Sequence, residues 1–278
     1  MRVKVVTVVK DDLEGIKRTT ESVIRQKIPV YWIVVTPKAN SYLNEYLESN
    51  KLAGVVKVVI DDDGLGVYPA MNQSIAWCEK EDWIWFLNAG DTFADNNSYV
   101  KAINAIEETT HSWIYGGHLL GSDSGGIIAE IPAPKEFKPS NQLFSRKYIS
   151  HQSVIFNAQF LQNLKGFNTH YKIAADWDLM VRAWRICKGE RIPEILSIFY
   201  MGGLSTFNRQ KGNQELLEIR NVQLHKKYIF KNYWWYFYRS GRNYIVRKFE
   251  ILDPEMANSI RKFRFFTHKK LRKKIDSV

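Results

Sequence analysis

The chain has 278 residues, of which 45% are hydrophobic, 25% are charged and 14% are aromatic. This mixture is typical of a soluble globular protein with one large domain, or one domain with an appendage, and excludes disorder throughout. The longest run without Lys, Arg, Asp or Glu is residues 148–164, and its histidine and amides exclude a membrane-spanning helix. The N-terminal apolar stretch stops at Lys10, too soon for a signal peptide. Two cysteines without C-x-x-C spacing argue against a disulfide framework or a thiolate zinc site, so we expect a cytoplasmic protein.

The net charge of +11 is confined to one end of the chain. Residues 1–224 carry 25 Lys+Arg and 25 Asp+Glu, whereas residues 225–278 carry 15 Lys+Arg and 4 Asp+Glu. The body is therefore electrically balanced, and the basic end needs its own explanation. We expect a domain at 1–224 followed by a basic, aromatic-rich, helical segment at 225–278.

The first 90 residues alternate between strand-like and helix-like patterns. The expected elements are a strand at 3–9, a helix at 12–26, a strand at 30–35, a helix at 42–50, a strand at 55–60, a helix at 68–79 and a strand at 83–87. The first strand is β-branched and almost uninterrupted, which is typical of a strand buried in a parallel sheet. This order predicts an α/β fold whose mostly parallel sheet is flanked by helices.

After residue 110 the pattern is less regular. We expect short strands with glycine turns at 113–117 and 125–128, a strand at 152–157, a helix at 176–188, a strand at 192–201 and a helix at 214–228. No internal repeat or low-complexity tract occurs, so the chain is not a repeat protein.

The fourth strand ends in a polar loop that contains a carboxylate, Asp91. Ligands of open α/β sheets bind beyond the carboxyl ends of the strands. A carboxylate at that place can hold a divalent cation against a nucleotide diphosphate. The alternative is that Asp91 caps the next element.

Five short motifs follow one another along the chain. They are Val5–Val9, Gly66–Ile75, Leu87–Asp91, His151–Ser153 and Ala175–Leu179. In this order and spacing they resemble the family 2 glycosyltransferases of GT-A fold, in particular the colanic-acid-type enzymes of bacterial polysaccharide assembly. The third motif resembles L-N-S-G-D, that subgroup's version of D-x-D, and the last resembles E-D-W-D-L. The resemblance covers about residues 1–210.

The resemblance implies a Rossmann-like nucleotide-diphospho-sugar transferase fold. It also implies inverting transfer of a sugar from a UDP- or GDP-sugar to a saccharide acceptor. Asp91 would hold Mg²⁺ or Mn²⁺, and Asp176 would be the catalytic base that takes the proton of the acceptor hydroxyl. The alternative for Asp176 is a helix N-cap, with Asp178 favoured in the first turn by the helix dipole.

The residues expected to bind the nucleotide sugar lie at the ends of the first, third and fourth strands, at the start of the helix expected at 68–79 and in the His151–Ser153 motif. These residues are Thr7, Val9, Asp61, Asp63, Tyr68, Asn72, Asn88 and His151. Met71 is expected in the core rather than at the donor, and His151 is as readily a structural group as a ligand contact.

Two alternatives to a glycosyltransferase remain. The family's D-G-S-x-D segment is replaced by Thr36–Ser41, which has no acidic residue, and this keeps a catalytically idle nucleotide-sugar-binding module in consideration. A nucleotidyltransferase would need a glycine-rich phosphate loop after the first strand, and Lys10–Gly15 does not supply one.

The basic segment interleaves aromatic residues with lysines and arginines. Aromatic rings favour the headgroup layer of a membrane, and basic residues are attracted to anionic lipid. We therefore expect a peripheral protein at the inner face of the plasma membrane, acting on a lipid-linked saccharide. The alternative is a helical subdomain that packs on the body or on another subunit. A nucleic-acid arm is disfavoured because the balanced body offers no basic face to extend it.

Overall fold

The computed structural model describes residues 1–37, 41–62, 64–122, 125–139, 149–201, 208–223, 232–241 and 244. The chain divides into two compact units, residues 1–203 and residues 204–278. The second unit contains helix α9 (Arg209–Gln223) and the helical residues 232–241. Because the division precedes the expected boundary after residue 224, α9 belongs to the second unit.

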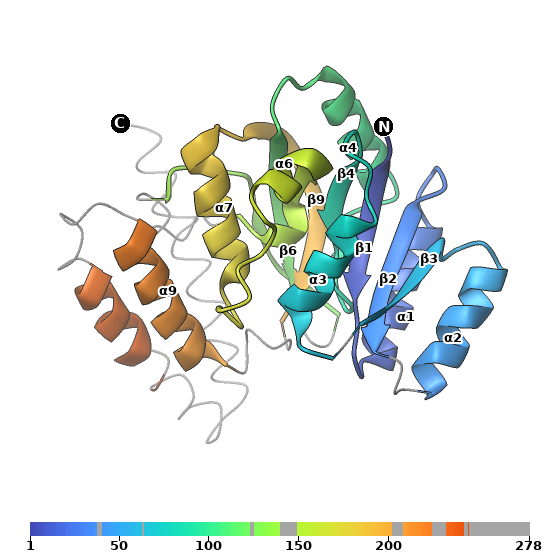
Figure 1. The fold of residues 1–278 in the computed structure, drawn as a ribbon, viewed down its shortest axis with the longest axis horizontal. Coiled ribbons are helices and arrows are strands. Elements are labelled where there is room, and N and C mark those ends of the chain that lie inside the picture. The colour runs from blue at the N-terminus through green and yellow to red at the C-terminus, as the bar shows by residue number, and fades with distance from the viewer. Residues whose placement is uncertain are drawn as a thin grey trace. The chain divides into compact units, whose positions relative to one another are not determined.

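The first half of unit 1 follows the predicted alternation of strands and helices (Figure 1). Its elements are β1 (Val3–Val8), α1 (Leu13–Ile24), β2 (Tyr31–Pro37), α2 (Ser41–Leu52), β3 (Val58–Asp62), α3 (Val67–Ala76) and β4 (Trp83–Phe86). Strand β1 lies between β2 and β4 and is parallel to both, and β2 is parallel to β3. The predicted α/β class, with a mostly parallel sheet flanked by helices, is confirmed.

The second half of unit 1 extends the same sheet with mixed pairing. Its elements are β5 (Thr92–Phe93), α4 (Ser98–Glu108), β6 (Trp113–Gly121), β7 (Ile127–Ile131), η1 (His151–Ser153), β8 (Val154–Asn157), α6 (Ala158–Asn163), α7 (Ala175–Ile186) and β9 (Glu190–Tyr200). The strand order is β3-β2-β1-β4-β8-β6-β9-β5, with β7 paired to β6. Strand β8 runs antiparallel to β4 and β6, whereas β9 runs parallel to β6.

Some element boundaries differ from the sequence expectations. The third strand begins at Val58 rather than at residue 55, because residues 53–55 form the turn that ends α2. Helix α4 was not expected, although Tyr99, Ala102 and Ile106 supply a buried stripe at helical spacing. Of the helix expected at 214–228, residues 214–223 lie in α9, and residues 224–228 lie outside the described residues.

The core places α1 against the carboxyl ends of β1 and β4. Buried side chains of α1, α2 and α4 share one hydrophobic cluster with Trp32 and Trp85 on one face of the sheet. Helix α1 begins at an N-cap, Asp12, whose side chain accepts a hydrogen bond from the Gly15 backbone N–H at 2.7 Å. The sharp start of α1 therefore lies at the sheet edge where the loop after β4 emerges.

Candidate active site

The loop after β4 is held against the first turns of α1. The backbone N–H of Gly90 donates to the Gly15 carbonyl at 3.0 Å and to the Thr19 hydroxyl at 3.1 Å. The Thr19 hydroxyl donates in turn to the Asp91 carbonyl at 2.8 Å. Gly90 has a φ of +91°, a left-handed conformation that other residues adopt only with strain. These contacts fix the positions of Asn88 and Asp91.

Asp91 is a buried carboxylate with partners from two distant segments. One oxygen accepts a hydrogen bond from the Gln152 side-chain amide at 2.7 Å, and the other accepts from the Tyr200 backbone N–H at 3.2 Å. Burial raises the pKa of Asp91 from 3.8 to about 7, against the opposing effects of the Gln152 hydrogen bond and of nearby His151 and Arg18. The Arg18 guanidinium lies 4.6 Å from the centre of the Tyr200 ring. Asp91 therefore sits where a bound cation would favour its ionised form.

His151 connects this loop with the start of α7. Its Nε2 lies 3.1 Å from Asn88 Nδ2, and its Nδ1 lies 3.2 Å from Asp176 Oδ2. With the Asn88 amide in this orientation its nitrogen donates to Nε2, which assigns the ring proton to Nδ1, facing the carboxylate. Three of the predicted site residues, separated by up to 88 positions, are thus joined in one hydrogen-bonded chain.

Asp176 lies in the first turn of α7 and is only partly buried. Its Oδ1 accepts from the Trp177 backbone N–H at 2.8 Å and lies 3.4 Å from the Tyr68 hydroxyl. The Tyr68 hydroxyl donates to the Ile173 carbonyl at 2.8 Å. These contacts fix the orientation of the Asp176 carboxylate at the N-terminal end of the helix, while part of the side chain stays accessible.

Asp178, two residues further on, has a different environment. It is 2% exposed, and its Oδ2 accepts from Arg182 Nε at 2.7 Å. The two terminal nitrogens of Arg182 donate to the carbonyls of Leu164 and Gly166, each at 2.7 Å. Asp178 therefore orients an arginine that ties α7 to the turn after α6.

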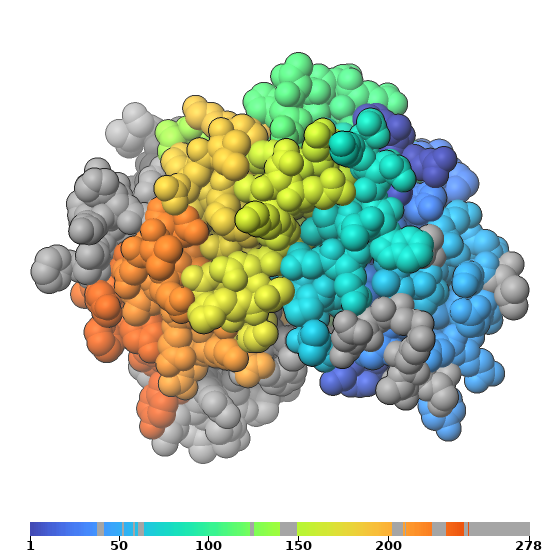
Figure 2. All heavy atoms as spheres, viewed as in Figure 1, coloured from blue at the N-terminus to red at the C-terminus, as the bar shows by residue number. Residues whose placement is uncertain are grey.

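Asn72 holds the same turn from the side of α3. Its amide nitrogen donates to the Phe167 carbonyl at 2.9 Å, and its amide oxygen accepts from the Phe167 N–H at 2.8 Å. Figure 2 shows α3 and the segment after α6 packed closely together on this face. The structure thus gives Asn72 a local partner, which differs from the expectation of a donor contact.

Thr7 and Val9 also differ from the expectation of nucleoside contacts. Thr7 is fully buried, donates to the Leu87 carbonyl at 2.6 Å and accepts from the Trp32 indole at 2.9 Å. Val9 is 3% exposed and belongs to the hydrophobic core. Both side chains are packed inside the protein, because β1, which contains Thr7 and ends just before Val9, is buried on both faces. Met71 is fully buried, as expected.

The acidic stretch after the third strand is described only in part. Asp61 belongs to β3, where it is paired with Thr36 of β2 in the parallel register. Asp63 lies outside the described residues. Both therefore remain predictions for the nucleotide-sugar site.

Sequence reasoning missed Gln152, Tyr200 and Arg18 as partners of Asp91. Gln152 belongs to the His151–Ser153 motif, and Tyr200 ends a strand, which is a position that favours ligand contacts. Arg18 carried no signal beyond its place on α1. Contacts between residues so far apart depend on how the strands are ordered, which the local pattern does not contain.

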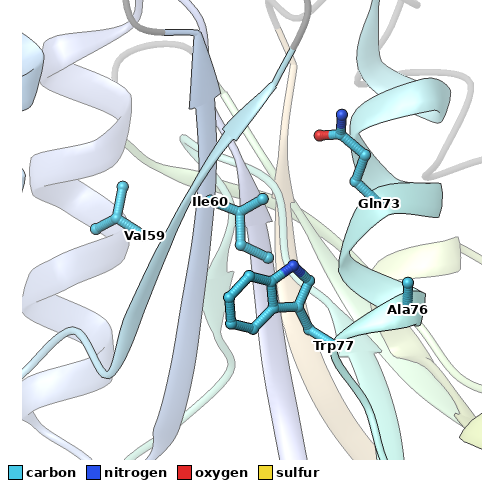
Figure 3. Close-up of a pocket in the computed structure, with 5 residues that line it drawn as sticks. All are labelled: Val59, Ile60, Gln73, Ala76 and Trp77. Carbon is cyan, nitrogen blue, oxygen red and sulfur yellow. The ribbon is translucent and has the colours of Figure 1, made fainter.

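The described surface also has a hollow of about 440 Å³ between β3 and α3 (Figure 3). It is lined by Val59, Ile60, Gln73, Ala76 and Trp77. None of the expected site residues is among them. The candidate site is therefore the Asn88–His151–Asp176 chain with Asp91, and not this hollow.

No protein-family model matches the chain. The chain is 26% identical over 235 residues to an uncharacterized glycosyltransferase of Mycobacterium tuberculosis, covering 82% of this chain and 86% of the relative. It is also 26% identical over 131 residues, 46% of this chain and 47% of the relative, to a PGL/p-HBAD biosynthesis glycosyltransferase of the same organism.

Solved structures show the same fold at low sequence identity. Mannosyltransferase PcManGT from Pyrobaculum calidifontis, in complex with GDP-Man and Mn²⁺, superposes with a TM-score of 0.62 at 12% identity, covering 97% of this chain and 80% of that one. S. aureus TarS 1–349 in complex with UDP-GlcNAc gives a TM-score of 0.61 at 13% identity, covering 84% and 70%. The chain covers 43% of a longer TarS structure. Together with the relatives, these likenesses place the chain among the glycosyltransferases with a GT-A-like fold, at the level of fold and general class.

Proposed function

We propose that the chain is an inverting glycosyltransferase that moves a sugar from a UDP- or GDP-sugar to a saccharide acceptor in bacterial surface polysaccharide assembly, of the colanic-acid type. The observation that carries the proposal is the link through His151 between Asn88, in the loop that ends at Asp91, and Asp176. Inverting transfer needs a base on one side of the sugar and a neutralised diphosphate on the other. The link supports the proposal because it joins Asp176, the proposed base, to the loop that ends at Asp91, the proposed diphosphate site.

Asp176 is the proposed base. It accepts the proton of the acceptor hydroxyl as that oxygen attacks the anomeric carbon and the bond to the diphosphate breaks. The Trp177 N–H on Oδ1 and His151 Nδ1 on Oδ2 hold the carboxylate in a fixed plane. A positioned general base contributes about 10²–10⁴-fold to the rate.

His151 is the proposed positioning residue for this base. Because Asn88 orients the ring through Nε2, the imidazole presents its Nδ1 proton to Asp176 and keeps one carboxylate oxygen occupied. The acceptor hydroxyl is then directed to the remaining lone pairs of the carboxylate. The sequence also predicts a direct contact of His151 with the donor. That contact would involve the same imidazole ring.

A divalent cation, Mg²⁺ or Mn²⁺, is the cofactor that the proposal includes. The oxygen ligands that such ions prefer are present. Asn88 Oδ1 is buried and has no hydrogen-bond partner among the described residues, and Asp91 offers a carboxylate. Among the described residues no group of three or more His, Cys, Asp or Glu side chains is placed to hold a metal ion, so the diphosphate and water would complete the coordination. A bound cation would supply Lewis-acid neutralisation of the leaving diphosphate.

The test is a turnover assay of the purified chain with a panel of UDP- and GDP-sugars, in MnCl₂ or EDTA, with and without a saccharide acceptor pool. The proposal predicts cation-dependent release of a nucleoside diphosphate from one class of donor. Donor binding without release would instead support the idle binding module. Formation of a nucleotide sugar from a nucleoside triphosphate would identify a nucleotidyltransferase. Absence of both binding and release across the panel would contradict the proposal.

A further inference from the structure

The helical residues 232–241 expose one side that is made of aromatic rings. The exposed fractions are 46% for Tyr233, 64% for Trp234, 67% for Phe237 and 45% for Tyr238. At about 100° per residue, these four positions fall on one side of a helix. Tyr244, beyond them, is 64% exposed. We call this set of five residues the aromatic face.

The other side of the same helix is partly buried and mixes polar residues with the aromatic residues Trp235 and Tyr236. Asn232 is 1% exposed, and its amide donates to the Asn221 side chain of α9 at 3.2 Å. Arg239 and Ser240 are partly buried on this side. A surface helix ordinarily buries its apolar stripe and exposes its polar residues. Here Asn232 is buried while four aromatic rings of the same helix are exposed, and a contiguous exposed apolar patch of this kind marks an interaction site.

The aromatic face has the chemistry of a membrane interface. Tyrosine and tryptophan carry an apolar ring with a polar tip, which suits the layer between lipid headgroups and acyl chains. The rings are ordered against one another, because Trp234 and Tyr238 stack with centroids 5.6 Å apart and an interplanar angle of 4°. None of the five residues is charged, so insertion of this side requires no desolvation of a charge.

The charge of the surrounding sequence indicates which kind of membrane surface would attract the aromatic face. Residues 225–278 hold 15 Lys+Arg against 4 Asp+Glu, and the residues between Asn232 and Tyr244 include no acidic residue. A second copy of the chain would bring a segment of like charge against this one, whereas an anionic lipid surface would attract it. Among the described residues no helix has the length and apolar character to span a bilayer. We propose that the aromatic face docks on the surface of an anionic membrane.

The docking is tested by vesicle flotation of the full chain. The double variant Trp234→Gln/Phe237→Gln removes two exposed rings from the face and leaves the buried side intact. The control is Trp77→Gln, because Trp77 is a similarly exposed tryptophan, at 57%, in the other unit. On vesicles containing phosphatidylserine, we expect the double variant to bind at least about 10-fold more weakly than wild type and the control to bind like wild type.

Trp234→Phe gives a second measurement that does not depend on the folding of the double variant. Trp234→Phe retains the apolar ring, so it should bind vesicles like wild type but show less quenching of tryptophan fluorescence by brominated lipid. Binding of wild type should fall as salt rises and on vesicles of phosphatidylcholine alone. Equal binding of the double variant and the control would overturn the proposal. Dimerisation that the double variant abolishes, without vesicle binding by wild type, would also overturn it and assign the face to a second copy.

Discussion

The two aspartates at the start of α7 are expected to respond to the same substitution in different ways. In Asp178→Asn, the carboxylate that pairs with Arg182 at 2.7 Å becomes a neutral amide, while Arg182 stays in place with its carbonyl partners Leu164 and Gly166. Leaving one member of a buried pair uncompensated costs about 3–5 kcal/mol. The Arg182 side chain retains 22% exposure and Asn still offers one acceptor, so we expect a loss of about 3 kcal/mol in the free energy of unfolding.

The assay is urea unfolding followed by circular dichroism, with thermal unfolding in parallel. A loss of about 3 kcal/mol is a large part of the about 5–15 kcal/mol of a typical domain, and it lowers Tm by about 6–12 °C for a unit of this size. The double variant Asp178→Asn/Arg182→Gln should lose less than the sum of the two single variants, because they share one interaction. An Asp178→Asn variant of wild-type stability that has lost sugar transfer would refute this reasoning and move the base to Asp178.

Two further predictions concern the loop after β4. Burial raises the pKa of Asp91 from 3.8 to about 7, so without a cation the ionisation of Asp91 opposes folding. The contribution of the neutral carboxyl group to the free energy of unfolding is therefore complete below about pH 4 and is lost as the pH rises to 7. In EDTA, Asp91→Asn should therefore gain stability relative to wild type across this range, by at most about 4 kcal/mol, and parallel stability–pH profiles of the two proteins would contradict the assignment. For Gly90→Ala, the φ of +91° predicts a loss of about 1–2 kcal/mol in the free energy of unfolding. The loss comes from backbone strain alone, since a Cβ there would meet no atom closer than 3.8 Å. Urea unfolding measures it, and a wild-type midpoint would show that the loop relaxes without cost.

The local pattern of the sequence was sufficient for the parallel half of the sheet. The β-branched run at 3–9 predicts a strand buried on both faces, and β1 has that environment between β2 and β4. The same burial explains why the environment of Thr7 differs from the expected nucleoside contact, because a threonine at the end of a strand has the same sequence signal whether its hydroxyl faces a ligand or the Trp32 indole.

The candidate site was predictable in its members but not in its connections. Asp91 and Asp176 stand in motifs whose spacing is informative, and both lie at element ends as expected. Their contacts with Gln152, Tyr200 and His151 arise from the antiparallel insertion of β8 beside β4 and from the return of β9. Such pairings depend on sheet order across 60 to 110 residues, which hydrophobic periodicity does not encode.

The measurement that tests the central claim most directly compares wild type with Asp176→Asn in sugar transfer and in donor affinity. Asparagine keeps the shape of the side chain and an acceptor for the Trp177 N–H, but it cannot take the proton of the acceptor hydroxyl. With the donor and cation that the panel identifies, transfer should fall by about 100-fold or more while the donor Kd stays within about 3-fold of wild type. Transfer near the wild-type rate in Asp176→Asn would contradict the account.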